Sequence, residues 1–167
     1  MAETTYFPSS NNYHLKKQDS TDRTKSNPLD GFCVAASALW CSNILKGKKP
    51  QNSKPCIARA GMLQSLYRRG GVAAQGGVLK VLSRVNITGH AYKTVTRLQA
   101  INRMGVNPGL YYCEGSRHAF AVDTRVGHFY FYDIASGLYG YGTLAEWETG
   151  IKARVPVAVA NWFYIRC

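Results

Sequence analysis

The pattern of apolar residues changes at Pro108, and this change limits the folds that the chain can adopt. Before Pro108, apolar side chains recur every three or four residues, as on one face of an α-helix. After it they alternate with other residues and are rich in aromatics, as in β-strands. Helices followed by strands predict an α+β fold in which N-terminal helices pack on a mostly antiparallel sheet. The 167 residues suffice for one domain with a full core.

The periodicity also predicts the individual elements. Helices are predicted over 34–46, 57–69, 76–85 and 95–104. Strands are predicted over 109–113, 117–123, 128–134 and 155–165, with a short helix over 143–150 between the last two. Residues 1–26 are rich in Ser, Thr, Asn and Lys without periodicity, which predicts a flexible polar leader. The folded domain then spans 27–167.

Charge is distributed unevenly along the chain, whose net charge is +12. Residues 31–113 contain twelve Lys and Arg and no Asp or Glu. Such a stretch produces a positive field that attracts acidic protein surfaces, anionic membrane or nucleic acid. Nucleic acid is not expected as a partner, because no RNA- or DNA-reading motif is present and aromatics are not interleaved with the basic residues.

The five cysteines and the apolar runs indicate the kind of compartment in which the protein acts. Cysteines occur at irregular spacing without a CxxC pair, which disfavours a disulfide scaffold or zinc ribbon and favours a reducing compartment. Cys33 and Cys41 would lie two turns apart on one helix, roughly 12 Å, too far for a disulfide. No apolar run approaches the roughly 18 residues of a membrane span. The N-terminal region lacks the apolar segment of a Sec signal peptide.

The stretch 117–137 predicts a β-hairpin that pairs two polar residues. If residues 124–127 connect two symmetric strands, opposed residue numbers sum to 251, and His118 lies opposite Asp133. Alternation then places His118 on the same face as Phe120 and Phe131. A carboxylate beside an imidazole orients the ring and stabilises its protonated form. His128 falls on the other face from Asp133, so it is expected to be structural or solvated.

Such a pair needs a nucleophile, and Cys33 is the candidate. It lies at the N-terminus of the predicted helix of 34–46, directly before its first residue, where the helix dipole and a nearby imidazolium both favour a thiolate. A free cysteine taken alone is more often buried in a core. The other four cysteines are expected to be buried in the core. Trp40 is expected to be a core residue as well. Cys33, His118 and Asp133 are therefore the predicted catalytic residues.

Three blocks in order resemble a known family: "GFCVAASALW" at 31–40, "RHAFAVD" at 117–123 and "FYFYDIASG" at 129–137. They are similar to the YopT/AvrPphB-type cysteine proteases, papain-like bacterial effectors that act inside eukaryotic host cells. The resemblance implies a papain-like fold over about 27–165, with Cys33, His118 and Asp133 as the triad. The chain departs from the family's Asp-Pro-Asn-x-Gly pattern with "DIASG".

The oxyanion hole is the other part of the site that the resemblance implies. Papain-like enzymes use the amide of the nucleophilic cysteine, here Cys33, together with an amide side chain a few residues before it. Asn27 is the candidate for that side chain. Asp30 is a poorer one, because its carboxylate would repel an oxyanion.

The resulting prediction is a monomeric thiol endopeptidase that needs no metal or organic cofactor. The resemblance implies an effector secreted by a non-Sec route into host cytosol, with membrane-associated signalling proteins as substrates. A basic face would suit an acidic substrate or an anionic membrane.

Two other interpretations stay open. A papain-like fold also supports deamidation, transglutamination and the hydrolysis of peptidoglycan amide bonds, and a basic amidase would suit an anionic cell wall. A basic binding module without catalysis is the third.

Overall fold

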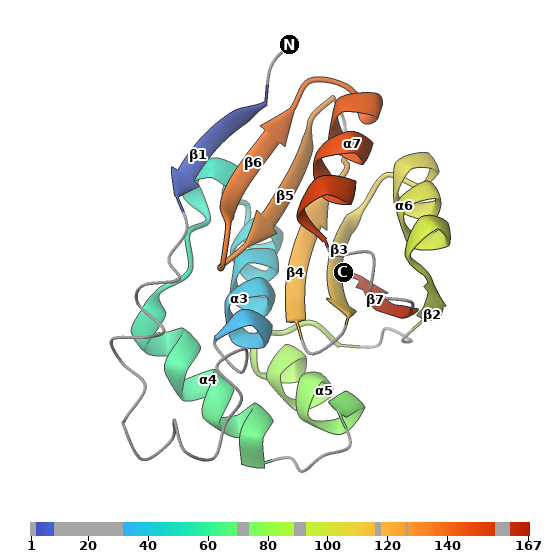
Figure 1. The fold of residues 1–167 in the computed structure, drawn as a ribbon. Coiled ribbons are helices and arrows are strands. Elements are labelled where there is room, and N and C mark those ends of the chain that lie inside the picture. The colour runs from blue at the N-terminus through green and yellow to red at the C-terminus, as the bar shows by residue number, and fades with distance from the viewer. Residues whose placement is uncertain are drawn as a thin grey trace.

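A computed structural model describes residues 3–8, 32–69, 74–88, 93–115, 118–125, 127–155 and 161–167. Seven strands of this part of the chain form one sheet in the order β1-β6-β5-β4-β3-β7-β2, and the paired strands are antiparallel (Figure 1). The strands are β1 (Thr4–Pro8), β2 (Lys93–Thr96), β3 (Leu110–Gly115), β4 (His118–Asp123), β5 (Phe129–Asp133), β6 (Gly137–Tyr141) and β7 (Asn161–Arg166). The helices are α3 (Cys33–Leu45), η1 (Pro50–Asn52), α4 (Ile57–Arg69), α5 (Ala74–Arg84), α6 (Arg97–Val106) and α7 (Leu144–Arg154).

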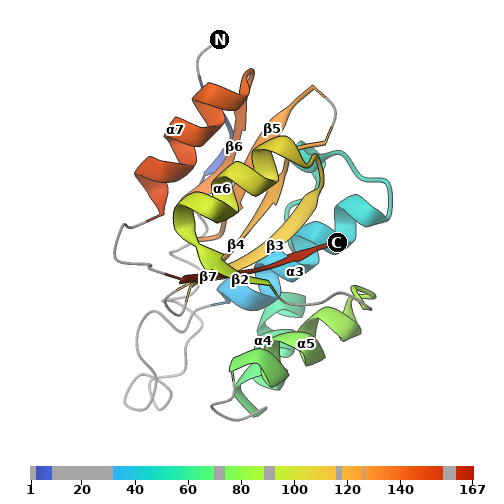
Figure 2. The ribbon, with the colours of Figure 1, turned by 90° about the vertical axis from the view of Figure 1, so that its right-hand side faces the viewer.

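Helices cover both faces of the sheet, and each face has its own hydrophobic core. Helix α3 packs on one face together with α4 and α5, whereas α6 and α7 pack on the other (Figure 2). Successive residues of a strand point to opposite faces, so Ala119 and Ala121 of β4 join the α3 core and Phe120 and Val122 join the other. The central strands are therefore buried on both sides. The predicted α+β fold is confirmed.

Helix α3 is buried on nearly all sides. Eleven of its residues are buried: Cys33, Val34, Ala35, Ala36, Ser37, Ala38, Leu39, Trp40, Cys41, Ser42 and Ile44. It lies against β4, where Ala119 and Ala121 are fully buried. Because these side chains are small, the helix and the strand can approach closely. Further along, the indole of Trp40 stacks on the Tyr132 ring at a centroid distance of 5.5 Å.

The predicted helices all occur, and all but one of them have shifted ends. The prediction for 57–69 coincides with α4, and that for 34–46 is α3 displaced by one residue. The strand predicted from 155 is wrong at its start, because Val155 caps the C-terminus of α7. Residues 156–160 lie outside the described residues. The helix predicted from 95 begins later, because the side chain of Thr96 accepts a hydrogen bond from the Gln99 amide in a capping box.

Three strands were not predicted. Strand β1 falls inside the predicted leader 1–26, and its pairing with β6 corrects that prediction for residues 4–8. Residues 9–31 lie outside the described part of the chain. Arg154 of α7 also contacts the residue before β1, because its Nη2 donates to Glu3 Oε1 at 2.5 Å. Strands β2 and β6 are short, and β6 contains two glycines, so neither shows a clear alternating pattern.

The predicted register of the β4–β5 hairpin is wrong by two residues. Ala121 pairs with Tyr132 and Asp123 with Tyr130, so opposed numbers sum to 253 and not to 251. The connection between the paired residues Asp123 and Tyr130 is therefore two residues longer than expected. A shift of two residues keeps every side chain on its face. His118 and Asp133 are consequently diagonal neighbours on one face.

None of the helices described is both long and apolar enough to cross a membrane.

Two helical glycines test this packing. A Cβ added at Gly150 of α7 would overlap the Tyr141 ring, whereas one at Gly61 of α4 would lie 3.5 Å from Phe32 Cζ, an ordinary contact. We expect Gly150→Ala to lower the unfolding free energy by about 1–3 kcal/mol through overpacking. Gly61→Ala should raise it by roughly 0.5–1 kcal/mol, because alanine favours helix. Urea denaturation of both variants measures the difference; equal effects would contradict the packing of α7 on Tyr141.

Candidate active site

Cys33 is the first residue of α3, at the end of the helix that lies near the start of β4 (Figure 1). Phe32 occupies the N-cap position and provides no side-chain hydrogen bond to the helix. The thiol is therefore placed where unpaired backbone amides and the positive end of the helix dipole favour a negative charge. Cys33 is 4% exposed.

His118 and Asp133 form a direct contact at the same end of the sheet. His118 is the first residue of β4 and Asp133 is the last of β5. His118 Nε2 lies 2.9 Å from Asp133 Oδ1, with the imidazole 33% exposed and the carboxylate 10% exposed. The predicted contact is thus present, although its register differs from the one that suggested it.

The "DIASG" turn orients this carboxylate. The Ala135 amide donates to Asp133 Oδ1 at 2.8 Å, and the Ser136 hydroxyl donates to Oδ2 at 3.2 Å. Gly137 then takes a positive φ of 119°, which favours glycine at that position. The turn that departs from the family's pattern still holds the carboxylate through its own backbone and serine.

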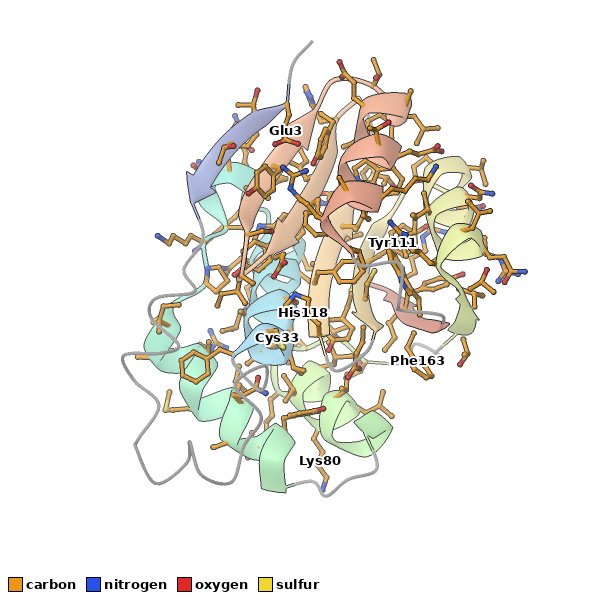
Figure 3. All side chains as sticks on the ribbon, in the orientation of Figure 1. Glu3, Cys33, Lys80, Tyr111, His118 and Phe163 are labelled. Carbon is orange, nitrogen blue, oxygen red and sulfur yellow. The ribbon has the colours of Figure 1, made fainter. Side chains whose placement is uncertain are left out.

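Cys33 and His118 lie side by side (Figure 3), and each affects the other electrostatically. Burial lowers the pKa of His118, but hydrogen bonds with Asp133 and Cys33 and their negative charges outweigh it. The net result is a pKa raised from 6.5 to about 10. Since Asp133 contacts Nε2, Nδ1 is the ring nitrogen left for the thiol. His118 is therefore an imidazolium at neutral pH.

These residues come from different layers of the structure. Alternation along β4 places His118 on the face of Phe120 and Val122, which α6 and α7 cover, whereas Cys33 belongs to α3 on the opposite face. Cys33 is the first residue of α3 and His118 is the first residue of β4. Their side chains therefore meet around the end of the sheet.

The comparison with solved structures found the avirulence protein AvrPphB of Pseudomonas. It matches with a TM-score of 0.62 and 13% identity over 81% of this chain and 90% of AvrPphB. A second match is the ubiquitin-specific protease of the murine cytomegalovirus tegument protein M48, solved with a ubiquitin-based suicide substrate. Its TM-score is 0.46 and its identity 11%, over 100% of this chain and 88% of that one. No family model matches the sequence, and no curated protein matches it.

This chain has the fold of a papain-like cysteine protease. The resemblance found in three sequence blocks is confirmed at the level of the fold. Cys33 is the first residue of the buried helix α3 in this fold.

A residue that the sequence did not predict contacts the start of α3. Gln64 of α4 is 2% exposed, and its Oε1 accepts a hydrogen bond from the Ala35 amide at 3.1 Å. Gln64 thereby caps the helix of Cys33 from a neighbouring helix, in place of an N-cap side chain. The weak signal in the sequence is a polar residue between Leu63 and Leu66 on the apolar side of α4.

Other residues considered from the sequence lie elsewhere. Asn27 and Asp30 fall outside the described residues. Asp123 forms a salt bridge of 2.9 Å with Arg125 at the far end of β4. His128 follows the hairpin connection, with its ring 6.1 Å from that of Tyr130. Trp40 is fully buried and belongs to the core.

Within the described ranges, no three or more His, Cys, Asp or Glu side chains are grouped so that they could hold a metal ion.

The cap by Gln64 can be tested by removing its acceptor. Gln64→Leu leaves the Ala35 amide buried without a partner, which should lower the unfolding free energy by about 1–3 kcal/mol. Gln51→Leu is the matched control, because Gln51 Oε1 has no partner among the described residues although it is buried. That change should leave stability unchanged or raise it slightly. Urea denaturation separates the two, and a harmless Gln64→Leu would contradict the cap.

The charge state of His118 can be measured by NMR titration of its ring. We expect protonation up to a pH near 10 in the wild type, and a lower pKa in Asp133→Asn because a stabilising charge is lost. A raised pKa means that the folded state binds the proton more tightly. The stability this contributes is therefore complete below pH 6.5 and is lost as the pH rises toward 10.

Asp123→Asn supplies the control, because Asp123 lies at the other end of β4 and pairs with Arg125. It should leave the His118 titration unchanged. A His118 ring that titrates alike in the wild type and in Asp133→Asn would show that the carboxylate does not stabilise the imidazolium.

Proposed function

We propose that this chain is a cysteine endopeptidase in which Cys33 is the nucleophile, His118 the acid and base, and Asp133 the residue that orients the imidazole. The observation that supports this best is that His118 contacts both Cys33 and Asp133. Cys33 in turn lies at the start of a buried helix. The papain-like fold is an independent support, because the resemblance of the three sequence blocks implies Cys33 as the nucleophile of such a fold.

The reaction follows from the charges of the pair. The Cys33 thiolate attacks the peptide carbonyl carbon, and the carbonyl oxygen becomes an oxyanion. His118 gives its proton to the leaving amine, so that an acyl-enzyme and a free amine result. The neutral imidazole then takes a proton from water, whose oxygen attacks the thioester. Release of the acid restores the thiolate and the imidazolium.

The free amides at the start of α3 favour the oxyanion site expected there. The Ala36 amide donates to the Phe32 carbonyl at 2.7 Å, and that of Ala35 to Gln64. The amides of Cys33 and Val34 have no acceptor among the described residues, so they are available to the reacting centre. Asn27 remains the candidate for a side-chain donor.

The biological setting is proposed from the fold and the composition. The similar structure AvrPphB is an avirulence protein of Pseudomonas, which favours an effector secreted by a non-Sec route that cleaves signalling proteins in host cytosol. The five cysteines are free, as in a reducing compartment. A net charge of +12 would attract acidic substrates or anionic membrane.

The test compares the wild type with Cys33→Ala and His118→Ala in a eukaryotic cell lysate and on purified peptidoglycan. New protein N-termini are quantified by mass spectrometry, together with deamidated residues and released muropeptides. We expect new N-termini that fall by roughly 10³-fold or more in both variants, because each removes a member of one catalytic unit.

Cys56→Ala is the matched control, because Cys56 is an exposed thiol outside the site. It should cleave like the wild type. Muropeptides or deamidated residues that depend on Cys33, without new N-termini, would replace the endopeptidase with an amidase or deamidase. Activity that survives in Cys33→Ala would refute the triad.

A further inference from the structure

A second pair of thiols lies away from the candidate active site. Cys41 is on α3, eight residues after Cys33, and Cys167 directly follows β7. The proposed peptidase reaction uses neither of them. The two are far apart in sequence, but the folding of β7 onto β3 brings them to one place in the core beneath α3.

Backbone contacts define this place. Cys41 Sγ lies 3.9 Å from the Tyr111 carbonyl, and the Cys167 amide donates to the neighbouring Leu110 carbonyl at 2.8 Å. Alternation along β7 puts Cys167 on the same face as Ile165, which packs in the α3 core, and Cys167 packs against that core as well. Both thiols therefore lie in the core between α3 and the sheet, next to the first two residues of β3.

The two thiols differ in access and in charge. Cys41 is fully buried and Cys167 is partly exposed. A hydrogen bond with Cys41 lowers the pKa of Cys167; burial opposes this, while the Tyr112 backbone and the Arg125 charge assist it, so the net pKa is below the ordinary value. Burial and the hydrogen bond with Cys167 raise the pKa of Cys41. Cys167 is thus the more readily ionised of the two thiols and the one that solvent can reach.

We propose that Cys41 and Cys167 are a redox modification site that forms a disulfide when the protein meets a peroxide. The Cys167 thiolate attacks one oxygen of hydrogen peroxide, which breaks the O–O bond, gives a sulfenic acid on Cys167 and releases hydroxide. The Cys41 sulfur then attacks the sulfenic sulfur. The sulfenic hydroxyl leaves with the Cys41 proton as water. Two thiols are oxidised, and one peroxide is reduced to two waters.

The disulfide would tie β7 to the helix that carries Cys33. Residues 41 and 167 enclose most of the folded chain, and a crosslink that closes a long loop stabilises the folded state. The midpoint of thermal unfolding is expected to rise by roughly 5–10 °C. A dithiol reductant should reverse the change.

The experiment uses the full chain with Cys33→Ser, so that the candidate nucleophile does not consume peroxide. After hydrogen peroxide at neutral pH, free thiols are alkylated and the chain is digested with chymotrypsin, which cuts after Trp40 and Tyr164. We expect a crosslinked pair of peptides, 41–45 joined to 165–167, and the rise in the unfolding midpoint, both lost after dithiothreitol.

Three variants make the result specific. Cys167→Ser should abolish the crosslink, and Cys41→Ser should leave a sulfenic acid on Cys167 that dimedone labels. Cys113→Ser should still form the disulfide, because Cys113 lies in the opposite core and contacts Met104. The proposal is overturned if Cys167 is oxidised to sulfinic acid while Cys41 stays alkylatable, if Cys167 links two chains, or if the exposed Cys56 reacts faster than Cys167.

Discussion

The packing of α3 against β4 is the contact on which the rest of this structure depends. A helix buried on nearly every side needs neighbours all round, and the sheet, α4 and α5 provide them. The alanines at 119 and 121 allow a close approach, and the stacking of Trp40 on Tyr132 sets the helix against β5. Because a helix in a close-packed core has little freedom to slide or rotate, its first residue is held in one position beside the start of β4.

That position explains how a charged pair is maintained in a partly buried place. Burial alone disfavours an imidazolium, yet the pKa of His118 rises because the ring hydrogen-bonds with Asp133 and Cys33 and lies beside their negative charges. Asp133 is in turn held by the Ala135 amide and the Ser136 hydroxyl. Gln64 completes the support from the other side, because it satisfies an amide that would otherwise be buried without a partner. The contact between Cys33, His118 and Asp133 is thus held in place by the groups around it.

The pattern of apolar residues predicted the long helices with an apolar face well. It predicted the strands at the edges of the sheet poorly. The prediction for α4 coincides with the observed helix, whereas the edge strands β1 and β2 were missed. Edge strands are short and exposed, so their sequences show little alternation. The hairpin register failed by two residues because the alternating pattern gives the face of each side chain but not the length of the connection between Asp123 and Tyr130. The contact between His118 and Asp133 survived, since a shift of two preserves the face.

The amino-acid sequence by itself determined that a thiol begins a helix, that an imidazole and a carboxylate share one face of a hairpin, and that helices precede strands. These properties depend on residues near one another in the chain, which periodicity reports directly. Only the tertiary structure decided that Cys33 meets His118 around the end of the sheet, that Gln64 caps the helix of Cys33, and that Cys41 lies beside Cys167. Each of these contacts joins different layers or distant strands, and its geometry follows from how two cores pack on one sheet.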